Sequence, residues 1–300
     1  MTSTELKQII KRDKHTLIEG KIAEFLFFRD AYPEIERKGS GISLNWWVVP
    51  YNNKYIFLKY MPENYKLNEN DKIIFDRLNK CNMEYYQMFI KDNEFLLLDR
   101  NFEVYTENDF LKLLKLNKND PYNAWEINIK RQKRAISFLE KNHLLYEFAM
   151  ERYIANYFLS SIFRRSWNID AFIIINKEIK IIEVKFKYPA SNNCYGMNFG
   201  QANLFRNLLT TCFDGLGHYI LLNRTYNNKV TILDIINDNI QTSWWTKEIN
   251  ARDIQYSIDN KVGFAPSKTQ LTAQREMRVV YFSKYEFDKF KDLGEDVYKL

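Results

Sequence analysis

The sequence predicts an α/β (α+β) fold in which a mixed sheet is flanked by helices. Apolar residues make up 46% of the 300 residues, against only 9 Gly and 6 Pro, and this composition is typical of a folded globular chain. Segments with helical periodicity alternate with short apolar segments bounded by turn residues. The order helix, strand pair, helix, strand pair occurs twice, which favours the hypothesis of two tandem copies of one fold, the N-terminal copy degenerate.

The expected elements of the first half follow its apolar periodicity and its turn residues. Asn52-Asn53 supplies the turn between two strands. The polar stretch 117–123, which contains Pro121, is the expected linker between an N-terminal α/β domain at 1–120 and a second domain with a C-terminal extension at 125–300. We expect a helix over 5–31, strands at 46–49 and 55–60, a helix over 71–81, strands at 85–90 and 95–98, and a helix over 107–116.

The second half repeats this order. A long helical stretch is broken near Asn142, and Asn176-Lys177 joins the first strand pair. We expect a helix over 129–163, strands at 170–175 and 179–186, a helix over 200–212, strands at 218–223 and 230–236, then helices at 247–258 and 285–293 on either side of a strand at 278–282.

Two features of the composition exclude classes of protein. No apolar run approaches the roughly 18 residues that span a bilayer, and the first residues contain no apolar signal core, so we expect a cytoplasmic protein without a membrane partner. Three cysteines and three histidines, all far apart, form neither a disulfide framework nor a zinc motif. A catalytic metal would therefore have to rest mainly on carboxylates.

The charge is concentrated in one segment. The net charge is +6, and residues 129–187 alone carry 12 basic and 6 acidic residues, a surplus of the same size. This segment opens with Lys130, Arg131, Lys133 and Arg134, and a clustered basic face is typical of nucleic-acid binding. A solvated helix face is the alternative.

The constellation that carries chemistry lies on the first strand pair of the second half. Asp170 stands at the start of one strand, and Glu183 and Lys185 lie on the next. Because strand side chains alternate, Glu183 and Lys185 share one face while Ile182 and Val184 point the other way into a core. Two carboxylates with oxygen-only ligation suit Mg²⁺ or Mn²⁺, and a lysine beside them can orient an attacking water and offset phosphate charge.

At these residues the chain resembles the PD-(D/E)xK nuclease superfamily. A helix, an acid, Glu-Val-Lys and a second helix match in order, over about residues 144–236. The resemblance implies a restriction-endonuclease-like fold, Asp170 and Glu183 as metal ligands, the main-chain carbonyl of Val184 as a further oxygen, and Lys185 as the catalytic lysine. An amphipathic hairpin with charged residues on its wet face is the alternative.

Several members of the superfamily place a Glu on the preceding helix as a further metal contact. Glu151 is the nearest candidate in the second half, with Glu147 one turn earlier. The Gly-x-x-Ala-Glu form of this helix appears only in the first half, as Gly20 to Glu24, and the corresponding position in the second half is Asn156.

Two other positions bear on the resemblance. The residue before the acid is Ile169 rather than Pro, a proline that members of the superfamily often lack. Gln201, on the following helix, resembles a glutamine that some members use near the site; a helix N-terminal role is the alternative.

If the first half is a second copy, its active positions are lost. Asn45 is matched to Asp170, Phe57 lies near the place of Glu183, and Lys59 is matched to Lys185. Phe57 cannot bind a metal, so we expect this half to contribute no chemistry. An unrelated α+β recognition domain is the alternative.

These observations predict a nuclease that depends on Mg²⁺ or Mn²⁺ and hydrolyses phosphodiesters of nucleic acid, DNA rather than RNA. One chain has one intact set of Asp, Glu and Lys, so concerted cutting of both strands of a duplex would need a homodimer. The alternative is a noncatalytic nucleic-acid-binding or scaffold protein that retains this fold.

Overall fold

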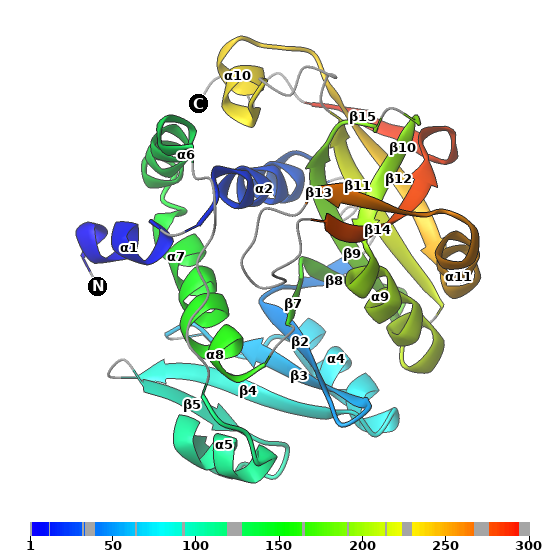
Figure 1. Ribbon diagram of the computed structural model, residues 1–300. Coiled ribbons are helices and arrows are strands. Elements are labelled where there is room, and N and C mark those ends of the chain that lie inside the picture. Colours follow the sequence, from blue (N-terminus) through cyan, green and yellow to red (C-terminus); the bar gives the residue numbers. More distant parts are fainter. Residues whose placement is uncertain are drawn as a thin grey trace.

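The computed structural model describes residues 2–11, 13–31, 33, 40–63, 65–91, 94–118, 128–163, 166–190, 192–213, 215–223, 230–266 and 276–293. Within these ranges the chain is a mixed α/β structure whose mixed sheets are flanked by helices, as predicted (Figure 1). Most of the expected linker at 117–123 lies outside the described residues. None of the described helices has the length and apolar character needed to cross a membrane.

Sheet A has six strands and carries the predicted constellation. Its order is β1 (Ser40–Ser43), β8 (Ala171–Ile175), β9 (Glu178–Lys187), β11 (Leu216–Asn223), β12 (Ser243–Asn250) and β15 (Asp288–Asp292). The neighbours β9 and β11 are parallel, and all the other neighbours are antiparallel. Asn176 and Lys177 both have positive φ in the β8–β9 turn, which is the geometry of a tight two-residue hairpin.

Sheet B also has six strands and, like sheet A, one parallel pair of neighbouring strands. Its order is β6 (Val104–Thr106), β5 (Glu94–Leu98), β4 (Glu84–Lys91), β3 (Lys54–Tyr60), β2 (Trp46–Tyr51) and β7 (Trp167–Ile169). Here β3 and β4 are the parallel pair. Asn52 and Asn53 have positive φ in the β2–β3 turn, as their type favours.

The two sheets exchange their first strands. β1, from the first half of the chain, pairs with β8 in sheet A, and β7, from the second half, pairs with β2 in sheet B. Each sheet then follows one path: hairpin, helix, a strand parallel to the second hairpin strand, and an antiparallel strand. Elements from the two sides of residues 120–125 therefore share sheets, while the hypothesis of a duplicated ancestor stays a prediction.

The helices are exchanged in the same way. α2 (His15–Leu26) packs against β9 and shares its core cluster with Ile182 and Val184 of sheet A. α7 (Leu145–Tyr153) and the π-helix η2 (Ile154–Leu159) bury Met150 and Ile154 against sheet B. The remaining described helices are α1 (Ser3–Ile10), η1 (Phe27–Ala31), α4 (Glu69–Lys80), α5 (Glu107–Leu114), α6 (Ile129–Lys141), α8 (Ser160–Ile162), α9 (Phe199–Thr211), α10 (Ile232–Asn237), α11 (Ala251–Asn260) and η4 (Lys284–Glu286).

A third sheet of three strands was only partly predicted. Its order is β10 (Cys194–Asn198), β14 (Glu276–Ser283) and β13 (Val262–Pro266), and β14 confirms the strand expected at 278–282. The expected strand at 230–236 is wrong: α10 forms there, because Thr231 and Asp234 make a capping box that starts a helix. The expected helix at 285–293 is wrong as well, since β15 occupies most of it and completes the edge of sheet A.

Candidate active site

Asp170 and Glu183 face each other across the β8–β9 hairpin. Ala171 pairs with Ile182, so the next residue on each strand, Asp170 and Glu183, lies directly opposite the other at the point where β7 departs toward sheet B. Ile182 and Val184 are buried on the α2 side, which confirms the predicted alternation of faces. Glu183 is 0% exposed and Asp170 is 7% exposed.

Lys185 lies beside both carboxylates. Its Nζ is 3.6 Å from Asp170 Oδ2 and contacts Glu183 Oε1. Burial and then the charge of Glu183 raise the pKa of Asp170 to about 7, and burial raises the pKa of Glu183. Burial alone would lower the pKa of Lys185, but the two carboxylates raise it above its usual value. Lys185 is therefore a cation beside two carboxyl groups whose charged forms are disfavoured by burial.

The main chain and α9 hold the carboxylates in place. The Val184 N–H donates to Asp170 Oδ2 at 2.7 Å. The N–H and C=O of a strand residue point to the same side, so the Val184 carbonyl faces the side of β9 on which Asp170 lies. The Gln201 side chain, from the first turn of α9, is near enough to lower the pKa of Glu183, so the structure brings this predicted residue to the site.

Glu24, the last residue of the Gly20 to Glu24 motif of the first half, lies beside the candidate site of the second half. It lies on α2, which packs on sheet A rather than on the sheet of its own half. Glu24 and Asp170 line one cavity. Burial and then the charge of Asp170 raise the pKa of Glu24 to about 8. The signal was present in the sequence as Gly20 to Glu24; what the sequence did not reveal is which sheet this helix covers.

Glu151 reaches the same cavity but is engaged by a lysine. Lys21 Nζ is 2.9 Å from Glu151, 3.2 Å from Glu24 and 3.7 Å from Glu147. The structure therefore places Glu151 in an acidic cluster around Lys21, in the wall of the cavity that Asp170 also lines. Its expected role as a metal ligand stays a prediction.

A divalent metal would have to rest on the Asp170 and Glu183 pair. Among the residues that the structure describes, no group of three His, Cys, Asp or Glu side chains could hold a metal ion. Mg²⁺ is commonly held by one or two carboxylates, with waters and substrate phosphate oxygens as the other ligands. Two facing carboxylates whose charged forms are disfavoured by burial, with a carbonyl on the same side, fit that donor set.

Lys187 is a second cation on the active face of β9 that the sequence argument did not single out. It follows Lys185 by two residues and therefore shares its face. Its Nζ donates to the Gly196 carbonyl of β10. Burial, and then the nearby charge of Lys185, lowers the pKa of Lys187 to about 8.

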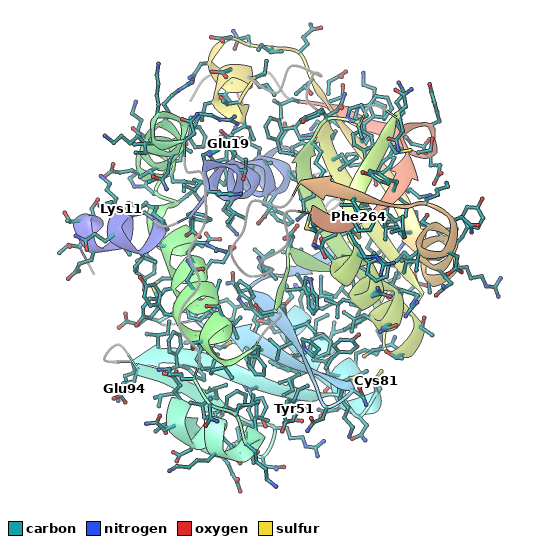
Figure 2. All side chains as sticks on the ribbon, in the orientation of Figure 1. Lys11, Glu19, Tyr51, Cys81, Glu94 and Phe264 are labelled. Atoms are coloured by element: carbon teal, nitrogen blue, oxygen red, sulfur yellow. The ribbon has the colours of Figure 1, made fainter. Side chains whose placement is uncertain are left out.

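The basic segment is not brought to the carboxylates. It lies on α6, and α2 packs against α6 on one side and β9 on the other (Figure 1). Arg131 makes two hydrogen bonds with Glu19, at 2.6 and 3.0 Å, and Glu19 points from α2 toward α6 (Figure 2). Arg134 pairs with Asp234 at 2.7 Å. Of the four predicted residues, Lys130 and Lys133 are exposed and are not the ones that pair with Glu19 or Asp234. Nucleic-acid binding by this segment stays a prediction.

The position in sheet B that corresponds to the carboxylates holds a buried ion pair instead. Counted from the hairpin turns, Lys59 stands where Glu183 stands and Trp46 where Asp170 stands, which corrects the match of Lys59 to Lys185. Lys59 Nζ lies 2.7 Å from Asp71 Oδ1, and both side chains are almost fully buried. Asp71 is the third residue of α4, as Gln201 is of α9.

No family model, curated protein or solved structure matches this chain. The functional assignment therefore depends on the geometry of the site itself.

For the nuclease activity that the sequence predicts, Glu24→Gln is expected to lower the rate about 10- to 100-fold, the loss typical of removing an outer group that supports the metal ligands. The amide keeps the shape of the side chain but removes the negative charge beside Asp170. Glu140→Gln is the matched control, because Glu140 also pairs with a lysine, Lys7, but is exposed and outside the cavity. Initial rates on one oligonucleotide would be compared, and equal rates for Glu24→Gln and Glu140→Gln would contradict a role for Glu24.

The stability of the metal-free protein is expected to fall as the pH rises from about 5 to 8. In this range the folded state holds protons on Asp170 and Glu24 that the unfolded state has released, because their pKa values are raised to about 7 and about 8. Mg²⁺ should reduce the fall, since it binds the ionised carboxylates of the folded state. Melting temperatures in EDTA and in Mg²⁺ across this range measure both effects; an unchanged pH dependence in Asp170→Asn/Glu24→Gln would assign it to other groups.

Proposed function

We propose that this protein is a metal-dependent nuclease that hydrolyses phosphodiester bonds of nucleic acid, with DNA preferred to RNA. The observation that supports it is the buried pair of Asp170 and Glu183 with the Lys185 ammonium beside both carboxylates. Buried carboxylates with raised pKa values destabilise the folded state, and clusters of such groups are typical of functional sites, where a role in function outweighs that cost. This favours an enzyme over a noncatalytic nucleic-acid-binding or scaffold protein.

Asp170, Glu183 and the Val184 carbonyl would hold Mg²⁺ or Mn²⁺. The bound cation supplies Lewis acidity toward the scissile phosphate. Lys185 orients the attacking water and offsets the charge that develops on the phosphate oxygens. The water oxygen bonds to phosphorus as one ester P–O bond breaks. The attacking water releases a proton to the solvent and the departing alkoxide takes one up from the solvent, so the products are a phosphate monoester and an alcohol.

One intact centre per chain cuts one strand at a time. Concerted cleavage of both strands therefore requires two chains related by a twofold axis, and we propose a homodimer for a product with double-strand breaks. Sedimentation of the protein with its preferred substrate measures this directly. A monomer that produces double-strand breaks in one binding event would contradict the argument.

The test is incubation of the purified protein with supercoiled plasmid, linear duplex, single-stranded DNA and RNA, in Mg²⁺, Mn²⁺ or EDTA. Cleavage in the two metals and none in EDTA is expected. Lys185→Ala should lower the rate by roughly 10² or more, whereas Lys180→Ala, on the same strand and nearer the hairpin turn, should not. Equal rates for the wild type and Lys185→Ala, or cleavage in EDTA, would refute the proposal.

A further inference from the structure

A cavity of about 410 Å³ opens beside Asp170, and Lys185 is not among its lining residues. It lies between α2, α7 and the beginnings of β2 and β7, and Glu24 and Asp170 form part of its wall. Its volume lies within the roughly 300–1,000 Å³ range of sites that take small organic groups. A group in this cavity would be next to any phosphate held at Asp170.

Flat aromatic rings form much of the wall. Phe28 follows α2, Trp47 lies on β2, Tyr60 on β3 and Tyr146 on α7. Tyr60 is buried in this wall, whereas Tyr146 is 45% exposed. Aromatic walls of this kind are suited to stacking against a planar ring.

The polar part of the wall disfavours a phosphate inside the cavity. In the described lining the carboxyl groups of Glu24, Glu147, Glu151 and Asp170 outnumber the single cation of Lys21. Such a wall repels an anion but accepts hydrogen bonds from the amino groups of a neutral ring.

Two amides complete the polar wall. Asn45 directly precedes β2 and Asn168 is the middle residue of β7, and both line the cavity together with Asp170. A side-chain amide offers both a donor and an acceptor, the combination that reads the edge of a nucleobase.

We propose that this cavity receives an unpaired nucleobase that flanks the scissile phosphodiester, stacked on Tyr146 and hydrogen-bonded by the amides and carboxylates. The inference rests on the proposed function and narrows its substrate to single strands or to duplexes with an unpaired base. A base inside a regular duplex reaches such a cavity only after it leaves its stack, which costs a few kcal/mol and selects against perfect duplexes.

The first test uses the wild-type protein and four substrates of one sequence: a single strand, a duplex with one unpaired base, a duplex with one mismatch and a perfect duplex. At least 10-fold faster cleavage next to the unpaired base than in the perfect duplex is expected. Cleavage of all four at equal rates would refute the cavity assignment and leave the nuclease proposal intact. Cleavage of none of them in Mg²⁺ or Mn²⁺ would refute the nuclease proposal itself.

The second test measures binding without cleavage. In the Lys185→Ala background, which leaves the lining of the cavity unchanged, a single strand carrying one 2-aminopurine should change its fluorescence on binding in Mg²⁺. Adding Tyr146→Ala should weaken that binding roughly 5- to 100-fold, the loss typical when a stacking partner of a base is removed. Tyr285→Ala is the matched control, because Tyr285 is 79% exposed and outside the cavity.

Folding of each variant is checked by its melting temperature. Equal affinities for the Tyr146→Ala and Tyr285→Ala variants, both folded, would refute the assignment. If Tyr146→Ala does not fold, Tyr146→Leu replaces it, and the substrate comparison with the wild type decides independently.

Discussion

Replacing Glu183 by glutamine is expected to abolish metal-dependent cleavage while the metal-free protein becomes more stable at pH 8. Glu183 is fully buried. Burial raises the pKa of this carboxyl group, so the free energy of unfolding falls once the pH exceeds the ordinary carboxyl pKa of the unfolded state. Glutamine has nearly the same shape, carries no charge and cannot replace a carboxylate as a metal ligand.

The expected loss of activity is at least about 10²- to 10³-fold, the range for removing one essential electrostatic group. The melting temperature in EDTA at pH 8 should rise, and the increase on adding Mg²⁺ should disappear. Glu178→Gln is the matched control, because Glu178 lies on the same strand but is exposed. A folded Glu183→Gln protein that cleaves at the wild-type rate would remove Glu183 from the active site.

Lys59→Met is expected to lower the free energy of unfolding by about 3–5 kcal/mol, because it leaves the buried Asp71 carboxylate without its cation. Lys59 Nζ lies 2.7 Å from Asp71 Oδ1 and 2.6 Å from the Leu44 carbonyl. The Tyr65 hydroxyl donates to the other Asp71 oxygen at 2.6 Å. Urea unfolding measures the loss.

The double variant Lys59→Met/Asp71→Leu should recover most of that stability, since replacing both members of a buried pair by apolar groups is often neutral. Cleavage by the folded double variant is expected within a few fold of wild type, because the pair lies in sheet B and Asp170 and Glu183 lie at the sheet A hairpin. A severe loss of cleavage with the fold intact would mean that sheet B takes part in the reaction.

The β8–β9 hairpin could be predicted from the sequence because its signals are local. Asn176-Lys177 fixes the turn, and the alternation from Ile182 to Lys185 fixes which side chains face the core. Together these place Glu183 opposite Asp170 without knowledge of any other element. The same signals placed the β2–β3 hairpin, although matching its residues to the catalytic ones required its register.

The position of Glu24 beside Asp170 could not be predicted from the sequence, because it depends on which sheet α2 packs against. An amphipathic helix buries its apolar face on whichever apolar surface it meets, and the periodicity of α2 is the same whether it covers sheet A or sheet B. The sequence therefore identified the Gly20 to Glu24 motif and assigned it to the nearer sheet. Only the packing of Ile22 and Ala23 in the core of sheet A reveals the true partner.

The exchange of β1 and β7 also fixes the order in which the chain folds during synthesis. Sheet B cannot gain its last strand until Ile169 has left the ribosome, and β1 must wait for β8 before it has a partner. Pairings between residues this far apart in sequence slow folding, because a long loop must close before the contacts form. The first half of the chain lacks β7, its partner strand from the second half, when it leaves the ribosome. Nascent chains would therefore carry open sheet edges, which are liable to aggregate, until both hairpins exist.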